Sequence, residues 1–137
     1  MSLLYFKKVT PSHPDLPAVI RLSIGNPTPE KVQKVLGLYE TSGHYLTGSF
    51  EADTLIGVMG FEVQRAKAII KHIAILPEYQ LQGVGKTFIE YLIDHFPLQI
   101  IHAETDDDAV DFYKKVGFIC QPFEGHYGKR YKCDYKR

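Results

Sequence analysis

HIAILPEYQLQGVGKTF, residues 72–88, decides the fold of this chain. It opens as a β-branched apolar run, breaks at Pro77, passes through Gly83 and Gly85, and becomes amphipathic from Lys86 onward. The pattern predicts a strand, a tight turn and the start of a helix. Glycines let the backbone approach a ligand, and the first turn of a helix offers unpaired N–H groups and a positive dipole end. The turn is therefore a candidate phosphate or pyrophosphate site, and a purely structural connection is the competing interpretation.

Two common phosphate loops do not account for this stretch. The pattern GxxxxGK[ST] is absent, and GxGxxG fails because Phe88 stands where the third glycine would be. A nucleotide bound here must therefore be held in another way.

Short apolar runs separated by turn residues extend in both directions from this stretch. Before it, the spacing predicts a strand, two helices and a three-stranded antiparallel meander, at residues 3–9, 16–25, 30–40, 45–52, 54–64 and 68–76. Thr28 is the expected N-cap of the second helix, with Pro29 at its first position. From residue 86 onward, the predicted order is helix, strand, helix and two strands, at residues 86–96, 98–104, 107–116, 118–123 and 129–135.

These elements predict one α/β domain over residues 1–137. We expect a mixed, mostly antiparallel central sheet of about six to seven strands, flanked by about four helices. A final strand at an exposed edge could pair between subunits in a homodimer.

Composition excludes several partners. The chain has 16 basic and 16 acidic residues, so no net charge attracts it to nucleic acid or to an anionic membrane. No apolar stretch approaches the roughly 20 residues of a membrane-spanning helix. The two cysteines, Cys120 and Cys133, have neither disulfide-scaffold nor metal-site spacing, and Cys120 is expected to be a small buried apolar residue. We therefore expect a cytoplasmic protein without a metal ion, a membrane anchor or a nucleic-acid partner.

Two blocks of the sequence resemble a known family. QLQGVG, residues 80–85, resembles the Q/R-x-x-G-x-G/A signature of the GCN5-related N-acetyltransferases (GNAT superfamily). AETDDDAVDFYKKVGF, residues 103–118, resembles the later motif of that superfamily, in which an Ala-x-x-Phe-Tyr-x-x-x-Gly-Phe helix follows an Asn or Asp. The blocks stand in the order of the family, and the predicted elements match its usual layout.

The resemblance implies acetyl-CoA as co-substrate. The backbone of Ile73, Ala74 and Ile75 would pair with the pantetheine arm as a neighbouring strand would. The pyrophosphate would be held mainly by backbone amides of Leu81, Gln82, Gly83, Val84, Gly85 and Lys86. Asp106 stands where many relatives place an Asn that contacts the cofactor, but an Asp cannot donate an amide N–H. The acidic run at residues 106–108 is expected to cap the following helix.

Catalytic roles follow less directly from the sequence. By resemblance, Tyr113 is the general acid that protonates the departing thiolate, and a backbone N–H near Ile75 stabilises the oxyanion. A base must take a proton from the acceptor amine, and the candidates are Glu62, His72 and Glu104. Each of the three also has an ordinary structural interpretation, as a solvated strand end or a sheet histidine.

The sequence therefore predicts an N-acetyltransferase that transfers acetyl from acetyl-CoA to a primary amine by direct attack in a ternary complex. The acceptor is open among a small amine, a peptide N-terminus and a lysine side chain. A non-catalytic acyl-CoA-binding regulatory module and a protein-interaction module are the alternatives, because a fold alone does not dictate function.

Overall fold

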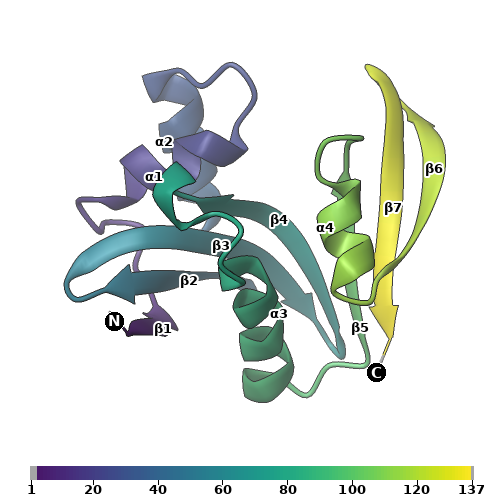
Figure 1. Cartoon of the computed structure of the whole chain (residues 1–137). Helices are drawn as coiled ribbons and strands as arrows, with labels where there is room; N and C mark the ends of the chain where they lie inside the picture. The colour runs from purple at the N-terminus through teal and green to yellow at the C-terminus, as the bar shows by residue number, and fades with distance from the viewer. Residues whose placement is uncertain (1–2, 137) are drawn as a thin grey trace.

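A single seven-stranded sheet organises the chain in the computed structural model, which describes residues 3–136 (Figure 1). Four α-helices and two short 3₁₀ helices accompany the strands. In chain order the elements are β1 (Leu4–Lys8), α1 (Leu16–Ile20), η1 (Arg21–Ser23), α2 (Pro29–Leu38), β2 (His44–Glu51), β3 (Thr54–Gln64), β4 (Lys67–Ile75), η2 (Pro77–Tyr79), α3 (Val84–His95), β5 (Ile100–Thr105), α4 (Val110–Lys115), β6 (Ile119–Gly125) and β7 (Gly128–Lys136).

The sheet is mixed and mostly antiparallel, which confirms the predicted fold class. Its strand order is β1-β2-β3-β4-β5-β7-β6, and only the pair β4 and β5 runs parallel. α3 provides the crossover between these two strands, as a parallel connection requires. Although β7 is the last strand in the sequence, it lies between β5 and β6 in the sheet.

Each face of the sheet packs against its own pair of helices. Phe88 and Leu92 of α3 join residues of β3, β4, β5 and α4 in one buried cluster. Leu16 of α1 and Leu36 of α2 belong to a second cluster with residues of β2 and β3. We call these the α3/α4 face and the α1/α2 face.

The two N-terminal helices differ in how well the sequence predicted them. α2 begins as expected, because the Thr28 hydroxyl accepts a hydrogen bond from the Lys31 N–H at 3.2 Å and Pro29 occupies the first turn. α1 is shorter than the predicted helix over residues 16–25 and gives way to a 3₁₀ turn. The Ser23 hydroxyl donates to the Ile20 carbonyl at 2.7 Å, a local bond of the kind that competes with helix propagation.

The last hairpin corrects two expectations. β7 is paired on both sides, so the premise of an exposed final strand is wrong, and β6 forms the edge instead. Pro122 lies in the middle of this edge strand. Cys120 and Cys133 face each other across the hairpin and form a disulfide, so Cys120 is not the small buried apolar residue that we expected.

Membrane insertion of the described helices can be assessed from their lengths. No helix within residues 3–136 is long and apolar enough to cross a membrane.

Candidate active site

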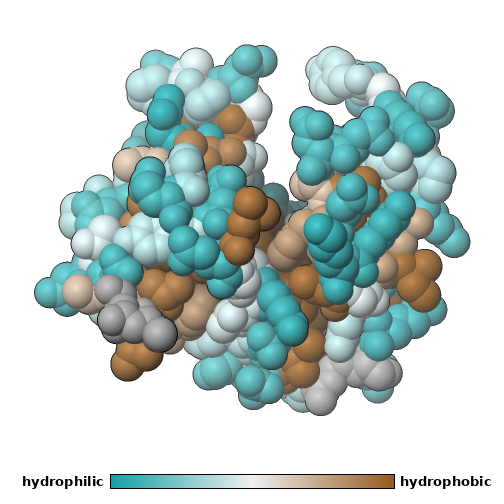
Figure 2. All heavy atoms as spheres, viewed as in Figure 1, coloured by the Kyte–Doolittle hydropathy of each residue, from teal (hydrophilic) through white to brown (hydrophobic). Residues whose placement is uncertain are grey.

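The site begins where β4 separates from β5. Their parallel pairing runs only from Lys67 and Ile100 to Ile70 and Ala103. On the other side of β4, the register with β3 jumps by one residue at Lys71, which forms a β-bulge. Bulges bend a strand and increase its twist, so β4 turns away from β5 beyond this point. Figure 1 shows the two strands diverging, and Figure 2 shows the surface hollowed between the two parts of the sheet.

The freed edge of β4 offers backbone groups to a ligand. The Gln80 side-chain amide donates to the Ile75 carbonyl at 3.0 Å, so this carbonyl is directed away from the β3 ladder. Backbone direction alternates along a strand, so Ile73 is directed to the same side. An extended ligand could therefore pair with β4 at Ile73 and Ile75.

The start of α3 faces the same space. Gly83 precedes the helix with φ 79°, in the left-handed region that favours glycine. The first helical bond runs from the Thr87 N–H to the Gly83 carbonyl at 3.1 Å, which leaves the earlier amides of the turn without helical partners. Gly85 also has a packing role that we did not expect. A Cβ there would stand 2.6 Å from the Phe112 ring, so this glycine allows α3 to pack against α4.

The edge of β4 and the start of α3 converge on one cavity of about 570 Å³. It is lined by Ile73, Ile75, Tyr79, Gln80, Leu81, Gly83, Val84, Gly85, Lys86, Asp108, Ala109, Phe112, Tyr113, Lys115 and Val116. A smaller cavity of about 300 Å³ lies between α1 and α2 and contains none of the predicted site residues.

Three predicted cofactor residues lie outside the lining. Ala74 is buried on the α1/α2 face, so only its backbone could contribute. The Gln82 amide donates to the Glu78 carbonyl at 2.9 Å. The Asp106 carboxylate accepts from the backbone N–H groups of Asp108 and Ala109, each at 3.1 Å, and so stabilises the turn before α4, whereas the N-cap of the helix itself, Ala109, has no side-chain cap bond. The predicted contact of Asp106 with the cofactor stays a prediction.

Tyr113 comes from α4 and is buried at the wall of the cavity. Burial raises the pKa of Tyr113 to about 12, and the negative charge of Asp106 adds to the effect. The phenol therefore keeps its proton at neutral pH and is a donor.

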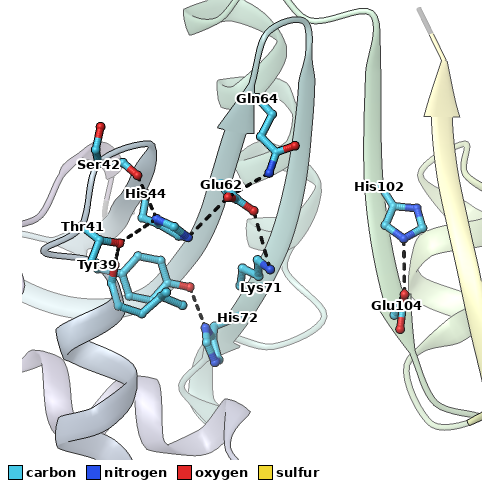
Figure 3. A network of polar contacts seen from close by, with 11 residues as sticks. Tyr39, Thr41, Ser42, His44, Glu62, Gln64, Lys71, His72, His102 and Glu104 are labelled. Atoms are coloured by element: carbon cyan, nitrogen blue, oxygen red, sulfur yellow. Dashed lines mark hydrogen bonds and ion pairs between the residues drawn. The ribbon is translucent and has the colours of Figure 1, made fainter.

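The candidate bases lie on the α1/α2 face, and Figure 3 shows them in two groups. Glu62 accepts from the Gln64 amide at 3.0 Å and lies 3.7 Å from both Lys71 and His44. The Gln64 hydrogen bond, followed by the charges of Lys71 and His44, lowers the pKa of Glu62. A carboxylate held in its charged form by these neighbours is a weak base.

His72 is held by a buried tyrosine. The Tyr39 hydroxyl lies 2.6 Å from Nδ1 of His72. Gly60 pairs with His72 across the strands, and a Cβ at Gly60 would stand 2.0 Å from the Tyr39 hydroxyl oxygen, so the glycine makes room for this bond. Burial lowers the pKa of His72, and the charge of Lys71 lowers it further.

Glu104 belongs to a group that sequence reasoning missed. It lies 3.6 Å from Nε2 of His102, and Nδ1 of the same ring lies 2.7 Å from the Asp134 carboxylate. His102 and Asp134 are paired directly across β5 and β7. Both stand on the polar side of alternating strands, but nothing in the sequence states that these two strands are neighbours.

Metal-binding side chains do not gather at this site. Within residues 3–136, no group of three or more His, Cys, Asp or Glu side chains is placed to hold a metal ion.

Comparison with known proteins agrees with this architecture. Among solved structures, an acetyltransferase from Thermus thermophilus is similar with a TM-score of 0.81 and 18% identity, over 100% of both chains. The PaiA N-acetyltransferase from Thermoplasma acidophilum in complex with coenzyme A has a TM-score of 0.73 and 18% identity, over 98% of this chain and 99% of that one. A spermidine N-acetyltransferase chimera of Vibrio cholerae SpeG and hSSAT has a TM-score of 0.76 and 17% identity, over 98% and 96%.

Sequence comparison identifies the family. No curated protein sequence matches the chain. The model of the acetyltransferase (GNAT) family, however, matches residues 16–118. This match covers most of the chain and includes the residues named above that line the cavity. The chain therefore belongs to the acetyltransferase (GNAT) family.

Proposed function

We propose that this protein is a single-domain enzyme that transfers the acetyl group of acetyl-CoA to a primary amine. The observation that best supports this proposal is that a free strand edge, the start of a helix and a buried tyrosine all line one cavity. A strand edge suits the amide-containing pantetheine arm, a helix start suits the pyrophosphate, and the tyrosine suits the departing sulfur.

The residues present fit the co-substrate. The backbone of Ile73 and Ile75 would pair with the pantetheine arm, and the amides at Gly83 to Lys86 would hold the pyrophosphate. At Gly83 an added Cβ would meet nothing within 4 Å, so the backbone is open to a ligand on that side. The relative from Thermoplasma acidophilum, whose structure contains coenzyme A, supports this assignment.

Acetyl transfer needs a neutral amine, a donor to the oxyanion and a proton for the thiolate. We assign the last role to Tyr113, which lines the cavity and keeps its proton. An unpaired backbone N–H of β4 near Ile75 would stabilise the oxyanion. The amine would approach from the α1/α2 face, through the opening between β4 and β5, and attack the thioester directly.

Two other functions use the same cavity differently. A regulatory module would bind acetyl-CoA without transferring the acetyl group, and a protein-interaction module would not bind CoA. The acceptor is a primary amine in our proposal, and the similarity to a spermidine acetyltransferase makes polyamines the first class to test.

Thermal-shift titration with acetyl-CoA, CoA, NAD and ATP tests the donor site first. A ligand at 100 times its dissociation constant stabilises the folded state by about 2.7 kcal/mol, so binding is easily detected. Thiol release from acetyl-CoA is then measured with spermidine, with a peptide that has a free N-terminus, and with an N-terminally blocked peptide that contains lysine. A shift with CoA and acetyl-CoA but no thiol release would favour the regulatory module, and no shift would refute both acyl-CoA functions.

The cytoplasmic location stays a prediction from the sequence. The disulfide of Cys120 and Cys133 weighs against a reducing compartment, since disulfides persist mainly in oxidising ones. Trapping the thiols with an alkylating reagent inside cells tests the prediction, because a cytoplasmic protein would be modified at both cysteines.

A further inference from the structure

We propose that His102 is the general base that deprotonates the acceptor amine, that Asp134 orients it, and that Glu104 holds the incoming ammonium group. This inference deepens the proposed acetyl transfer and rests on it. It adds to the proposed primary amine that the acceptor arrives in its charged form.

The hydrogen bond to Asp134 fixes the tautomer of His102. The Asp134 oxygen lies 2.7 Å from Nδ1, and a carboxylate can only accept, so Nδ1 carries the ring hydrogen. The lone pair of the neutral ring is then on Nε2, which lies on the side of Glu104 at 3.6 Å. This is the arrangement by which an aspartate orients a histidine base in other enzymes.

The position of the group along β5 brings it to the opening of the sheet. Pairing with β4 stops at Ala103, so Glu104 is the first residue of β5 beyond the paired segment. His102 lies two residues earlier on the same side of the strand, where β5 is still paired with β4 at Ile69, and its Nε2 lies 3.6 Å from Glu104, on the side of the opening. The α1/α2 pair of helices packs on β2 to β4, and Figure 3 shows His102 and Glu104 together on β5, apart from the group that contains Glu62 and His72.

Both carboxylates and lysine ammonium groups surround His102. Glu104 and Asp134 supply two carboxylates at the ring. On β7, Lys132 and Lys136 stand two residues before and two residues after Asp134, so the three side chains lie on the same side of the strand. On β4, Lys67 and Lys71 lie on the side that faces the group, and Lys71 is engaged with Glu62. Lys132 is the cross-strand partner of Glu104, but its ammonium group lies over the Phe123 ring, 4.8 Å from the centroid. The ion-pair partner of Glu104 is His102, so an incoming ammonium group can bind at Glu104 without displacing a lysine.

His72 is unsuited to this role, although it lies at the same opening. The buried Tyr39 proton needs an acceptor, and Nδ1 of His72 is the partner at 2.6 Å. Burial raises the pKa of Tyr39, which keeps that proton on the phenol. The hydrogen of a neutral His72 is then on Nε2, so its free nitrogen is a donor and not a base.

Each proton can be followed through the reaction. The ammonium group donates one proton to Nε2 of His102, and the imidazolium formed is stabilised by Asp134 and Glu104. The neutral amine forms the N–C bond as the thioester carbonyl becomes an oxyanion. When the oxyanion collapses, the C–S bond breaks, Tyr113 gives its proton to sulfur, and the second proton of the attacking nitrogen restores the phenol. His102 releases its proton to solvent, so the products are an N-acetyl amine, CoA with a free thiol, and one proton.

Imidazole ¹⁵N NMR of the whole protein tests the tautomer without any acceptor. In the neutral form of each imidazole, we expect the hydrogen of His102 on Nδ1 and that of His72 on Nε2. In Asp134→Asn the preference of His102 should be lost. A wild-type His102 with its hydrogen on Nε2 would overturn the proposal.

Kinetics test the base itself. Thiol release from acetyl-CoA is measured with n-butylamine, which is charged at neutral pH, and with hydroxylamine, which is already neutral. His102→Gln should lower kcat/KM for n-butylamine by about 10²-fold or more, while the loss with hydroxylamine stays below about tenfold. Asp134→Asn should lose activity in the same pattern, and His95→Gln, on the exposed end of α3, is the matched control. Equal losses with both amines would refute a base role for His102.

These outcomes can be separated from failure of the proposed function. If the wild-type protein does not bind acetyl-CoA, or does not raise the rate of thiol release above that without protein for either amine, the acetyl transfer itself is refuted. If it binds and transfers but His102→Gln behaves as the wild type does, only the assignment of the base is refuted.

Discussion

Replacing Gly83 by alanine separates strain in the fold from contact with the ligand. Gly83 has φ 79° and ψ 10°, a left-handed conformation that costs an L-residue about 1–2 kcal/mol. An added Cβ meets no atom within 4 Å, so no clash adds to this cost in the free protein. For a chain of 137 residues, the unfolding entropy of about 2.1 cal/mol/K per residue converts this loss to a fall in Tm of about 3–7 °C.

Binding should suffer for a different reason. If the pyrophosphate lies against the backbone of Gly83, any Cβ meets the ligand. Gly83→Asn is the matched variant, because asparagine tolerates the left-handed region and should lower Tm less than alanine does. We expect both variants to weaken CoA binding at least about tenfold, or 1.4 kcal/mol, by isothermal titration calorimetry. Wild-type affinity in both would refute the contact, and an affinity loss that follows the loss of stability would show that strain alone is responsible.

Three further predictions concern other parts of the molecule. Tyr113→Phe should lower the turnover of an identified amine by about 10²-fold with CoA affinity unchanged, and an unchanged rate would make Tyr113 a core aromatic only. Reduction of the disulfide between Cys120 and Cys133, which are 13 residues apart, should lower the free energy of unfolding by about 3 kcal/mol in urea titrations, whereas an unchanged midpoint would contradict this. Burial lowers the pKa of His72 below 6.5, so the unfolded chain binds a proton at this residue more readily than the folded protein does. The free energy of unfolding should therefore decrease as the pH is lowered below about 6.5, and it should decrease less in His72→Gln. Identical pH profiles of the two proteins would exclude His72 as the cause.

The fold was predictable because its signals are local. Alternating apolar runs separated by short polar breaks indicated the β2 to β4 meander, and Thr28 with Pro29 marked the start of α2. The end of α1 was not predictable from periodicity, since apolar spacing does not show the bond from the Ser23 hydroxyl to the Ile20 carbonyl, which competes with helix propagation. The place of β7 beside β5 depends on long-range pairing that no local pattern encodes, whereas the disulfide depends on the register of the β6–β7 hairpin.

The candidate site was likewise predictable only where its residues are close together in the sequence. Residues of the turn before α3 are contiguous in the sequence, so the cavity wall around Gly83 was found, although the role of Gly85 in packing against Phe112 was not. His102 and Asp134 are 32 residues apart and meet only through strand register. A group assembled from separate elements of the fold is therefore invisible to motif reading. Each candidate base that the sequence offered, Glu62, His72 and Glu104, is one member of such a group.

The proline in the edge strand affects how the protein behaves in a crowded solution. Pro122 stays in register with Tyr131, so its nitrogen, which has no hydrogen, faces outward from the sheet. A foreign strand that docked along β6 would find a hydrogen-bond donor missing at the centre of its template. Growth of the sheet by strand addition, the first step toward many fibrils, is thereby discouraged at the β6 edge, which leaves β1 and the freed edge of β4 as the edges open to another strand.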